Sequence, residues 1–305
     1  MQSLLNPVIQ QLNQVILGKP HQVKLAVACL LAQGHLLIED LPGMGKTTLG
    51  QAIAKVFGLE FQRIQFTSDI LPSDITGANI FDRDKGTFQF HRGPIFSQLV
   101  LADEINRATP KAQSALLEAM EENQVTVEGQ TYQLPKPFFV IATQNPSHQV
   151  GTYPLPESQL DRFLFKVELG YPDLEYEKTL LKGQSGRVKV ESIKNVLSLE
   201  QLASLQNDVN SVNVSSHLLD YVMQLVSATR TSPDFAHGLS PRAGLAIVGA
   251  AKAWAYLSGR EFVLPEDVQQ IFVPCAAHRL QFVKTSNENT SKLVEAIVEG
   301  IAIPV

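Results

Sequence analysis

The chain has 305 residues, of which 44% are hydrophobic and 18% charged, and its formal net charge is −5. This length allows two domains, and the acidic balance with scattered Lys and Arg argues against nucleic acid as the main partner. No apolar run reaches the roughly 20 residues of a membrane span, the N-terminus lacks a signal-peptide pattern, and Cys and His show no metal-ligand spacing. We therefore expect a cytoplasmic protein with no membrane span.

Residues 1–171 alternate short apolar segments with helical segments. This order is typical of an α/β fold in which a parallel sheet is sandwiched between helices. The predicted strands span 35–39, 61–67, 98–103, 138–142 and 163–169, and the predicted helices span 46–57 and 110–122. In the helix at 110–122 we expect Thr109 as the N-cap and Pro110 as the first helical residue.

Residues 172–305 have a different pattern. Helical spacing recurs without a convincing strand, which predicts a smaller, all-helical lid domain after the α/β core of residues 1–171. We expect the hinge at 170–173 and a loop at 183–194. The predicted helices of this lid span 174–182, 199–205, 217–229, 241–257 and 265–279.

A glycine-rich loop follows the first predicted strand and opens the next helix. It consists of Leu41, Pro42, Gly43, Met44, Gly45, Lys46, Thr47 and Thr48. Such a P-loop points backbone N–H groups and a helix N-terminus at phosphate groups, which predicts a nucleotide-binding core. Lys46 would reach the β- and γ-phosphates, Thr47 would coordinate Mg²⁺, and Thr48 is a further candidate for a phosphate contact. The general pattern has Gly where this chain has Asp40, a residue type that tolerates unusual backbone angles.

An apolar strand that ends in two carboxylates supplies the second half of the predicted site. Residues 99–102 are apolar and lead into Asp103 and Glu104, as in a Walker B motif. A strand delivers its last side chains to the carboxyl edge of a sheet, where ligands bind in open α/β folds. We expect Asp103 to hold Mg²⁺ through water, and Glu104 to orient or deprotonate the attacking water. The two motifs together predict Mg-dependent ATP hydrolysis.

Further segments carry a resemblance that covers nearly the whole chain. They are 103–108 leading into 113–121, then 141–146, 153–157 before 160–163, and 238–243. In order and spacing they resemble the MoxR family of AAA+ ATPases, from about Val15 to Phe272. The resemblance implies an ATPase core followed by a helical lid, with ATP and Mg²⁺ as cofactors.

The resemblance also assigns roles to residues outside the two motifs. Asn145 corresponds to sensor 1, which hydrogen-bonds the γ-phosphate or the water. Arg162 corresponds to the arginine finger, and Arg242 corresponds to sensor 2, which reaches the nucleotide from the helical domain. Arg offers an always-charged fork that suits phosphate oxygens. The expected catalytic residues are therefore Lys46, Glu104, Asn145, Arg162 and Arg242.

Several of these assignments have a structural alternative. Ile16 and Gly18 resemble the segment that packs on adenine, but apolar core packing would explain them nearly as well. Arg162 could instead form a salt bridge with Asp161 or Glu157. Arg242 could be a surface residue at a helix N-terminus.

The arginine finger completes the site of a neighbouring subunit, so the resemblance implies a homo-oligomeric ring, expected to be a hexamer. Related proteins remodel or mature a protein client and are often paired with von Willebrand A domain proteins. Two predicted hairpins, at 80–90 and 124–132, correspond to insertions that face the ring pore and touch the substrate. Plain surface hairpins without such a role are the alternative.

Two functions of other classes stay open. A nucleic-acid-stimulated motor related to replicative helicases would share the hairpin insertions, although the acidic charge argues against it. A non-hydrolysing nucleotide switch is the second. It would normally have lost at least one site residue, whereas all of these are present: Lys46, Asp103, Glu104, Asn145 and Arg162.

Overall fold

The computed structural model describes residues 2–145, 151–171, 174–181, 190–281, 283 and 290–303. Its centre is a five-stranded sheet with the strand order β2–β5–β8–β1–β9, in which all neighbours pair in parallel. The predicted α/β class with a parallel sheet is therefore confirmed. The strands are β1 (Leu36–Glu39), β2 (Phe61–Gln65), β5 (Leu99–Asp103), β8 (Phe139–Gln144) and β9 (Phe165–Val167).

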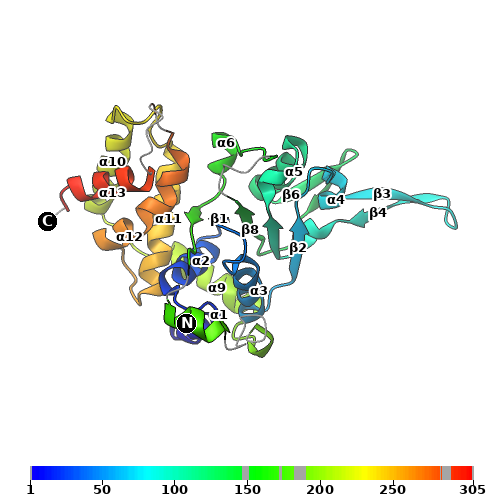
Figure 1. Cartoon of the computed structure of the whole chain (residues 1–305), viewed down its shortest axis with the longest axis horizontal. Coiled ribbons are helices and arrows are strands. Elements are labelled where there is room, and N and C mark those ends of the chain that lie inside the picture. The colour runs from blue at the N-terminus through cyan, green and yellow to red at the C-terminus, as the bar shows by residue number, and fades with distance from the viewer. Residues whose placement is uncertain are drawn as a thin grey trace.

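Helices cover both faces of the sheet (Figure 1). Because side chains alternate along a strand, Leu99 and Leu101 of β5 pack into one apolar cluster, and Val100 and Ala102 into another. The first cluster includes α1, α2 and α3, and the second includes α4 and α5. These helices are α1 (Leu5–Val15), α2 (Pro20–Leu31), α3 (Lys46–Phe57), α4 (Pro72–Thr76) and α5 (Pro110–Glu122).

Helix α5 begins as predicted at Pro110, with Thr109 as its extended N-cap residue. The Thr109 side chain makes no capping hydrogen bond, so only its backbone conformation serves the helix start. Strand β9 is shorter than predicted, because the chain leaves the sheet after Val167. The backbone N–H groups of Leu169 and Gly170 donate instead to the carboxylate of Asp40, at 2.8 and 2.6 Å.

Helices α10–α13 gather at one end of the molecule, whereas α7 lies beside the N-terminus and α9 packs against α2 (Figure 1). In α9, Gln206 Nε2 donates to the carbonyl oxygen of Leu30 at 2.9 Å. The apolar cluster that includes α2 continues through α9 into α11 and α12, so these C-terminal helices and the sheet share one core. The helices are α7 (Leu174–Leu181), α9 (Leu199–Asn210), α10 (Ser216–Thr231), α11 (Pro241–Leu257), α12 (Pro265–Ala276) and α13 (Thr290–Gly300).

The predicted boundary between residues 171 and 172 stays a prediction, since 172 and 173 of the expected hinge lie outside the described residues. The same holds for 183–189 of the expected loop and for residue 146 at the end of the sensor 1 segment.

No helix among the described residues is long and apolar enough to cross a membrane. Short elements complete the fold: η1 (Gln2–Leu4), η2 (Pro94–Phe96), η3 (Ile105–Arg107), α6 (Glu157–Leu160) and η4 (Ala277–Arg279).

Two antiparallel hairpins stand outside the main sheet. The first, β3 (Gly77–Asp82) with β4 (Thr87–Arg92), is longer than the predicted 80–90 and projects away from α10–α13 (Figure 1). At its base Gly77 has φ 90°, and a Cβ there would lie 2.2 Å from the carbonyl oxygen of His91, so only glycine fits. The second hairpin, β6 (Gln124–Val127) with β7 (Gln130–Gln133), confirms the one predicted at 124–132.

Candidate functional site

The glycine-rich loop connects β1 to α3 at the carboxyl edge of the sheet. Gly43 and Gly45 have φ of 88° and 90°, in the region where residues with a Cβ are strained. This backbone curl lets α3 begin at Lys46 with its free N–H groups facing the loop. The local geometry is that of an anion-binding helix N-terminus.

Asp40 ties the start of this loop to the end of β9. Its Oδ1 accepts from the Leu41 N–H at 2.8 Å, and its Oδ2 accepts from Leu169 and Gly170. Asp40 does not have a positive φ, so tolerance of unusual backbone angles is not why aspartate replaces the usual glycine. The carboxylate is there as a hydrogen-bond acceptor that fixes the loop to the sheet edge.

Lys46 is buried and points back into the loop. Its Nζ donates to the carbonyl oxygen of Asp40 at 2.7 Å. Burial lowers the pKa of Lys46, and the nearby carboxylates of Asp103, Asp40 and Glu104 oppose that shift. The ammonium therefore lies between the glycine-rich loop and the acidic end of β5, where a phosphate chain would meet both.

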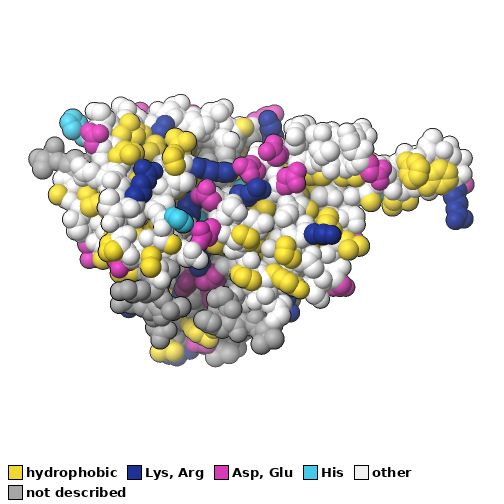
Figure 2. Space-filling model, turned by 90° about the horizontal axis from the view of Figure 1, so that it is seen from above, with side chains coloured by type: hydrophobic (Ala, Val, Ile, Leu, Met, Phe, Trp, Pro, Cys, Tyr) yellow, Lys and Arg dark blue, Asp and Glu magenta, His cyan; other side chains and the backbone are white. Residues whose placement is uncertain are grey.

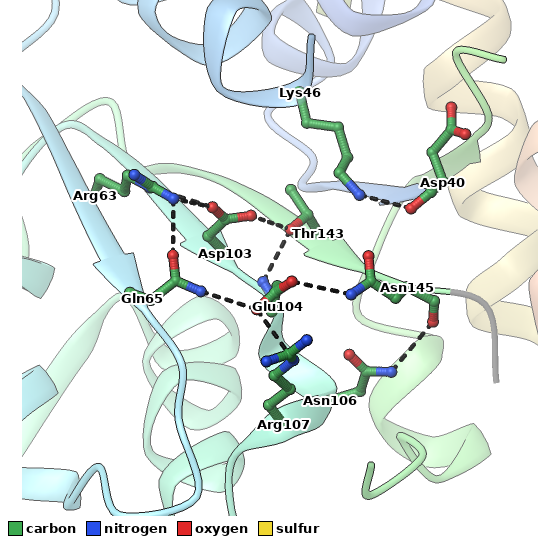
Figure 3. A network of polar contacts seen from close by, with 10 residues as sticks. All are labelled: Asp40, Lys46, Arg63, Gln65, Asp103, Glu104, Asn106, Arg107, Thr143 and Asn145. Atoms are coloured by element: carbon green, nitrogen blue, oxygen red, sulfur yellow. Dashed lines mark hydrogen bonds and ion pairs between the residues drawn. The ribbon is translucent and has the colours of Figure 1, made fainter. Parts of the chain in front are cut away.

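Asp103 is the last residue of β5 and Glu104 follows it, and Thr143 of the neighbouring strand β8 connects the two (Figure 3). The Thr143 hydroxyl donates to Asp103 Oδ1 at 2.6 Å and accepts from the Glu104 N–H at 2.9 Å. Glu104 has φ 57° and ψ 47°, a left-handed conformation that is rare for a residue other than glycine. This turn carries the Glu104 side chain out of the strand and toward the next loop.

The Glu104 carboxylate accepts hydrogen bonds from three sides (Figure 3). Asn145 Nδ2 donates to Oε1 at 3.0 Å, Gln65 Nε2 donates to Oε2 at 3.1 Å, and Arg107 Nε forms an ion pair with Oε2 at 3.1 Å. Asn145 is itself buried at the end of β8. The predicted sensor 1 residue and the predicted water-orienting carboxylate are thus in direct contact.

These groups surround a cavity of about 430 Å³. A Mg²⁺ ion would fit its chemistry, because the Thr47 hydroxyl and the Asp103 carboxylate both line it and hard cations prefer oxygen ligands. Within the described part of the chain, no group of three or more His, Cys, Asp or Glu side chains could hold a metal by itself. The lining residues are Pro42, Gly43, Gly45, Lys46, Thr47, Thr48, Gln51, Arg63, Gln65, Asp103, Glu104 and Asn145.

The two predicted phosphate-binding arginines of the later motifs lie elsewhere. Arg162 Nη2 pairs with Glu121 Oε2 at 2.8 Å, and Arg242 Nη1 pairs with Glu121 Oε1 at the same distance. The alternative prediction, a salt bridge from Arg162 to Asp161 or Glu157, is therefore wrong in its partner. Arg162 pairs with Glu121, and Asp161 pairs with Arg279 at 2.6 Å. Neither Arg162 nor Arg242 lines the cavity.

Three further predicted contacts also fall outside the cavity lining. Ile16 is buried in the apolar cluster of α1 and α2, and a Cβ on Gly18 would lie 2.7 Å from the ring of Tyr176. Met44 lies in the glycine-rich loop and packs against the same apolar cluster. Packing accounts for all three positions in this structure.

Arg63 and Gln65 are site residues that the sequence pattern did not indicate. Because they are two residues apart, their side chains lie on the same face of β2. Strand β2 lies next to β5, with Gln65 in register with Asp103. Arg63 Nη2 pairs with Asp103 Oδ2 at 2.5 Å and donates to Gln65 Oε1 at 2.7 Å. The strand also contains the polar Gln62, so its polar residues alone gave no signal that set Arg63 and Gln65 apart.

Comparison with known proteins adds to this geometry. A model of the ATPase family associated with various cellular activities (AAA) matches residues 35–165, and a model of the AAA lid domain matches 227–301. The chain is 44% identical to the uncharacterized protein YeaC of Bacillus subtilis, over 99% of this chain and 95% of that protein. It is 38% identical to the chaperone MoxR1 of Mycobacterium tuberculosis, over 98% of this chain and 82% of that protein. This chain belongs to the MoxR family of AAA ATPases.

A solved structure supports the same assignment. A protein of Cytophaga hutchinsonii, described as a candidate ATPase, superposes on this MoxR-family chain with a TM-score of 0.90 and 36% identity, over 100% of this chain and 96% of that one. The chain is accordingly a nucleotide-binding ATPase with a helical lid.

Proposed function

We propose that this MoxR-family ATPase hydrolyses Mg-ATP in the cavity between the glycine-rich loop and the ends of β5 and β8. The observation that carries this proposal is the convergence of Lys46, Asp103, Glu104 and Asn145 around one cavity. Backbone N–H groups of the loop from Pro42 to Thr48 and the α3 N-terminus would bind the phosphates. Phosphoryl transfer needs positioning and charge neutralisation more than covalent chemistry, and these groups supply both.

Each side chain has a role that follows from its contacts. The Lys46 ammonium, now on a backbone carbonyl, would exchange that acceptor for phosphate oxygens. Glu104 accepts from Asn145, so the two can orient one water molecule between them. Thr47 and Asp103 would hold Mg²⁺, which when bound neutralises phosphate charge.

The catalytic unit is proposed to be a homo-oligomeric ring, with six subunits as the expected number. Arg162 and Arg242 meet at Glu121 and stand outside their own cavity, so they would contact a nucleotide held by a neighbouring subunit. In this arrangement Arg162 acts as the arginine finger, and Arg242 joins it from the lid. Charged contacts across a closed ring would then link hydrolysis to assembly.

The proposed output is chaperone-like remodelling of a protein client, with a von Willebrand A domain protein as the expected partner. The relative MoxR1 carries the name chaperone. The hairpin β3–β4 offers a matching surface, because Phe81 and Phe88 near its tip are 50% and 70% exposed. Apolar side chains stand out at the end of this projection in Figure 2. Exposed aromatic rings on a projecting hairpin suit contact with a partly unfolded chain.

The function is tested by Glu104→Gln with Glu200→Gln as a matched control on the exposed side of α9. We expect Glu104→Gln to keep ATP binding and to lower the ATPase rate by about 100-fold or more, the usual contribution of a positioned general base. The Glu200→Gln rate should equal the wild-type rate. A Glu104→Gln enzyme with the wild-type rate would reject this site as the place of hydrolysis.

A further inference from the structure

Arg63 binds one carboxylate oxygen of Asp103, and both residues line the cavity. Asp103 Oδ2 accepts from Arg63 Nε at 3.2 Å and from Nη2 at 2.5 Å, while Oδ1 is engaged by Thr143. The Asp103 side chain is only 10% exposed, so its contacts are set by the protein, whereas the Arg63 side chain is 45% exposed. Both good acceptor positions of Oδ2 are therefore used by one guanidinium.

Gln65 extends this contact to the second carboxylate. Arg63 Nη2 donates to Gln65 Oε1 at 2.7 Å, and Gln65 Nε2 donates to Glu104 Oε2 at 3.1 Å (Figure 3). One face of β2 thus connects both acidic residues of β5 through a guanidinium and an amide. The positive charge also reduces the repulsion between two carboxylates that follow one another in the chain.

We propose that Arg63 is a positioning residue that competes with the divalent cation for Asp103, and so sets the metal concentration at which the site takes up Mg-ATP. The inference rests on the proposed function of the cavity. A cation near Asp103 Oδ2 would meet a guanidinium that is always protonated, so Arg63 must leave this oxygen before the metal can use it. Its half-exposed position allows that movement.

The experiment measures equilibrium binding of a fluorescent, non-hydrolysable ATP analogue while free Mg²⁺ is raised from chelated to millimolar levels. In Arg63→Gln we expect the Mg²⁺ midpoint to fall by about three- to fivefold, the scale of a half-exposed ion pair. Arg63→Lys should give a midpoint between those of the wild type and Arg63→Gln, since a single ammonium cannot bond Asp103 and Gln65 as the fork does. Lys292→Gln on the exposed side of α13 controls for net charge and should keep the wild-type midpoint.

The outcomes separate this inference from the function on which it rests. An unchanged or higher Mg²⁺ midpoint in Arg63→Gln overturns the competition, and a higher one would place Arg63 on the phosphates instead. A wild-type protein that binds no analogue at any Mg²⁺ concentration would reject the nucleotide site itself. Thermal unfolding reports whether each variant is folded, and if Arg63→Gln is not, a wild-type midpoint in Arg63→Lys overturns the proposal.

Discussion

Glu104 combines a left-handed backbone conformation with a carboxylate that contacts three neighbouring side chains. A non-glycine residue at φ 57° costs about 1–3 kcal/mol, so the surrounding contacts must hold it there. Its N–H is fixed by Thr143 and its carboxylate by Asn145, Gln65 and Arg107. Strain of this kind is typical of residues that are kept for function. It supports Glu104 as the water-orienting group.

His35 gives the fold a defined sensitivity to acid. It is buried between β8 and α5, where Nδ1 accepts from the Val140 N–H at 3.1 Å and Nε2 lies 3.3 Å from the Met120 carbonyl oxygen. Burial lowers the pKa of His35 from 6.5 to about 4. Between these pH values the unfolded chain binds a proton that the folded chain does not, so the free energy of unfolding falls as pH falls.

The prediction concerns His35→Gln, compared with wild type by urea unfolding at pH 7, 6 and 5. Wild type should lose stability toward pH 5, and the variant should lose less, by up to about 1.4 kcal/mol per pH unit. Its stability at pH 7 should be lower because the buried contacts change. His217→Gln, exposed on α10, is the control and should follow the wild-type curve. Parallel pH dependences in His35→Gln and wild type would contradict the argument.

At the scale of elements, the two hairpins are joined by side chains. Phe90 of β4 stacks on Tyr132 of β7 with ring centroids 4.1 Å apart, and both rings contact Phe96 edge-on. Asn79 Nδ2 of β3 donates to Glu128 Oε2 in the turn of the second hairpin at 2.7 Å. The hairpins are therefore expected to move as a pair rather than independently.

A double-mutant cycle tests this coupling. Phe90→Ala and Tyr132→Ala together should destabilise the protein less than the sum of the single changes, by about 0.5–1.5 kcal/mol, as aromatic pairs do. Phe88→Ala replaces Phe90→Ala in the control cycle, because Phe88 lies on the same strand but contacts Phe81. The control cycle should be additive within error. Additivity in both cycles would mean that the stacking does not connect the hairpins.

Across the whole molecule, sequence patterns predicted those structural features that depend only on residues close together in the chain. The glycine-rich loop, the acidic end of β5 and both hairpins were predicted from consecutive residues, and all of them form, although the first hairpin is longer than predicted. Arg63 and Gln65 could not be placed, because their contact with Asp103 and Glu104 depends on β2 lying beside β5. That strand order is a property of the sheet and not of any single segment.

The same reason explains what was missed in the C-terminal half. The helical pattern of α9 was predicted, but its position against α2 was not, since amphipathic spacing does not identify the surface that covers the apolar face. Likewise no pattern pointed to Glu121 as the shared partner of Arg162 and Arg242. Because both arginines lie outside the cavity of their own chain, the proposed hydrolysis depends on a site shared between subunits.

A mixture of two inactive variants tests whether the site is shared between subunits. Glu104→Gln chains keep Arg162 but cannot hydrolyse in their own cavity, and Arg162→Ala chains keep the cavity but lack the finger. Each variant alone should be inactive, and a mixture assembled from both should regain a measurable part of the wild-type ATPase rate, because some intact cavities then face an intact Arg162. A mixture that stays inactive while both variants bind ATP and co-assemble, or an Arg162→Ala protein with the wild-type rate, would contradict a site shared between subunits.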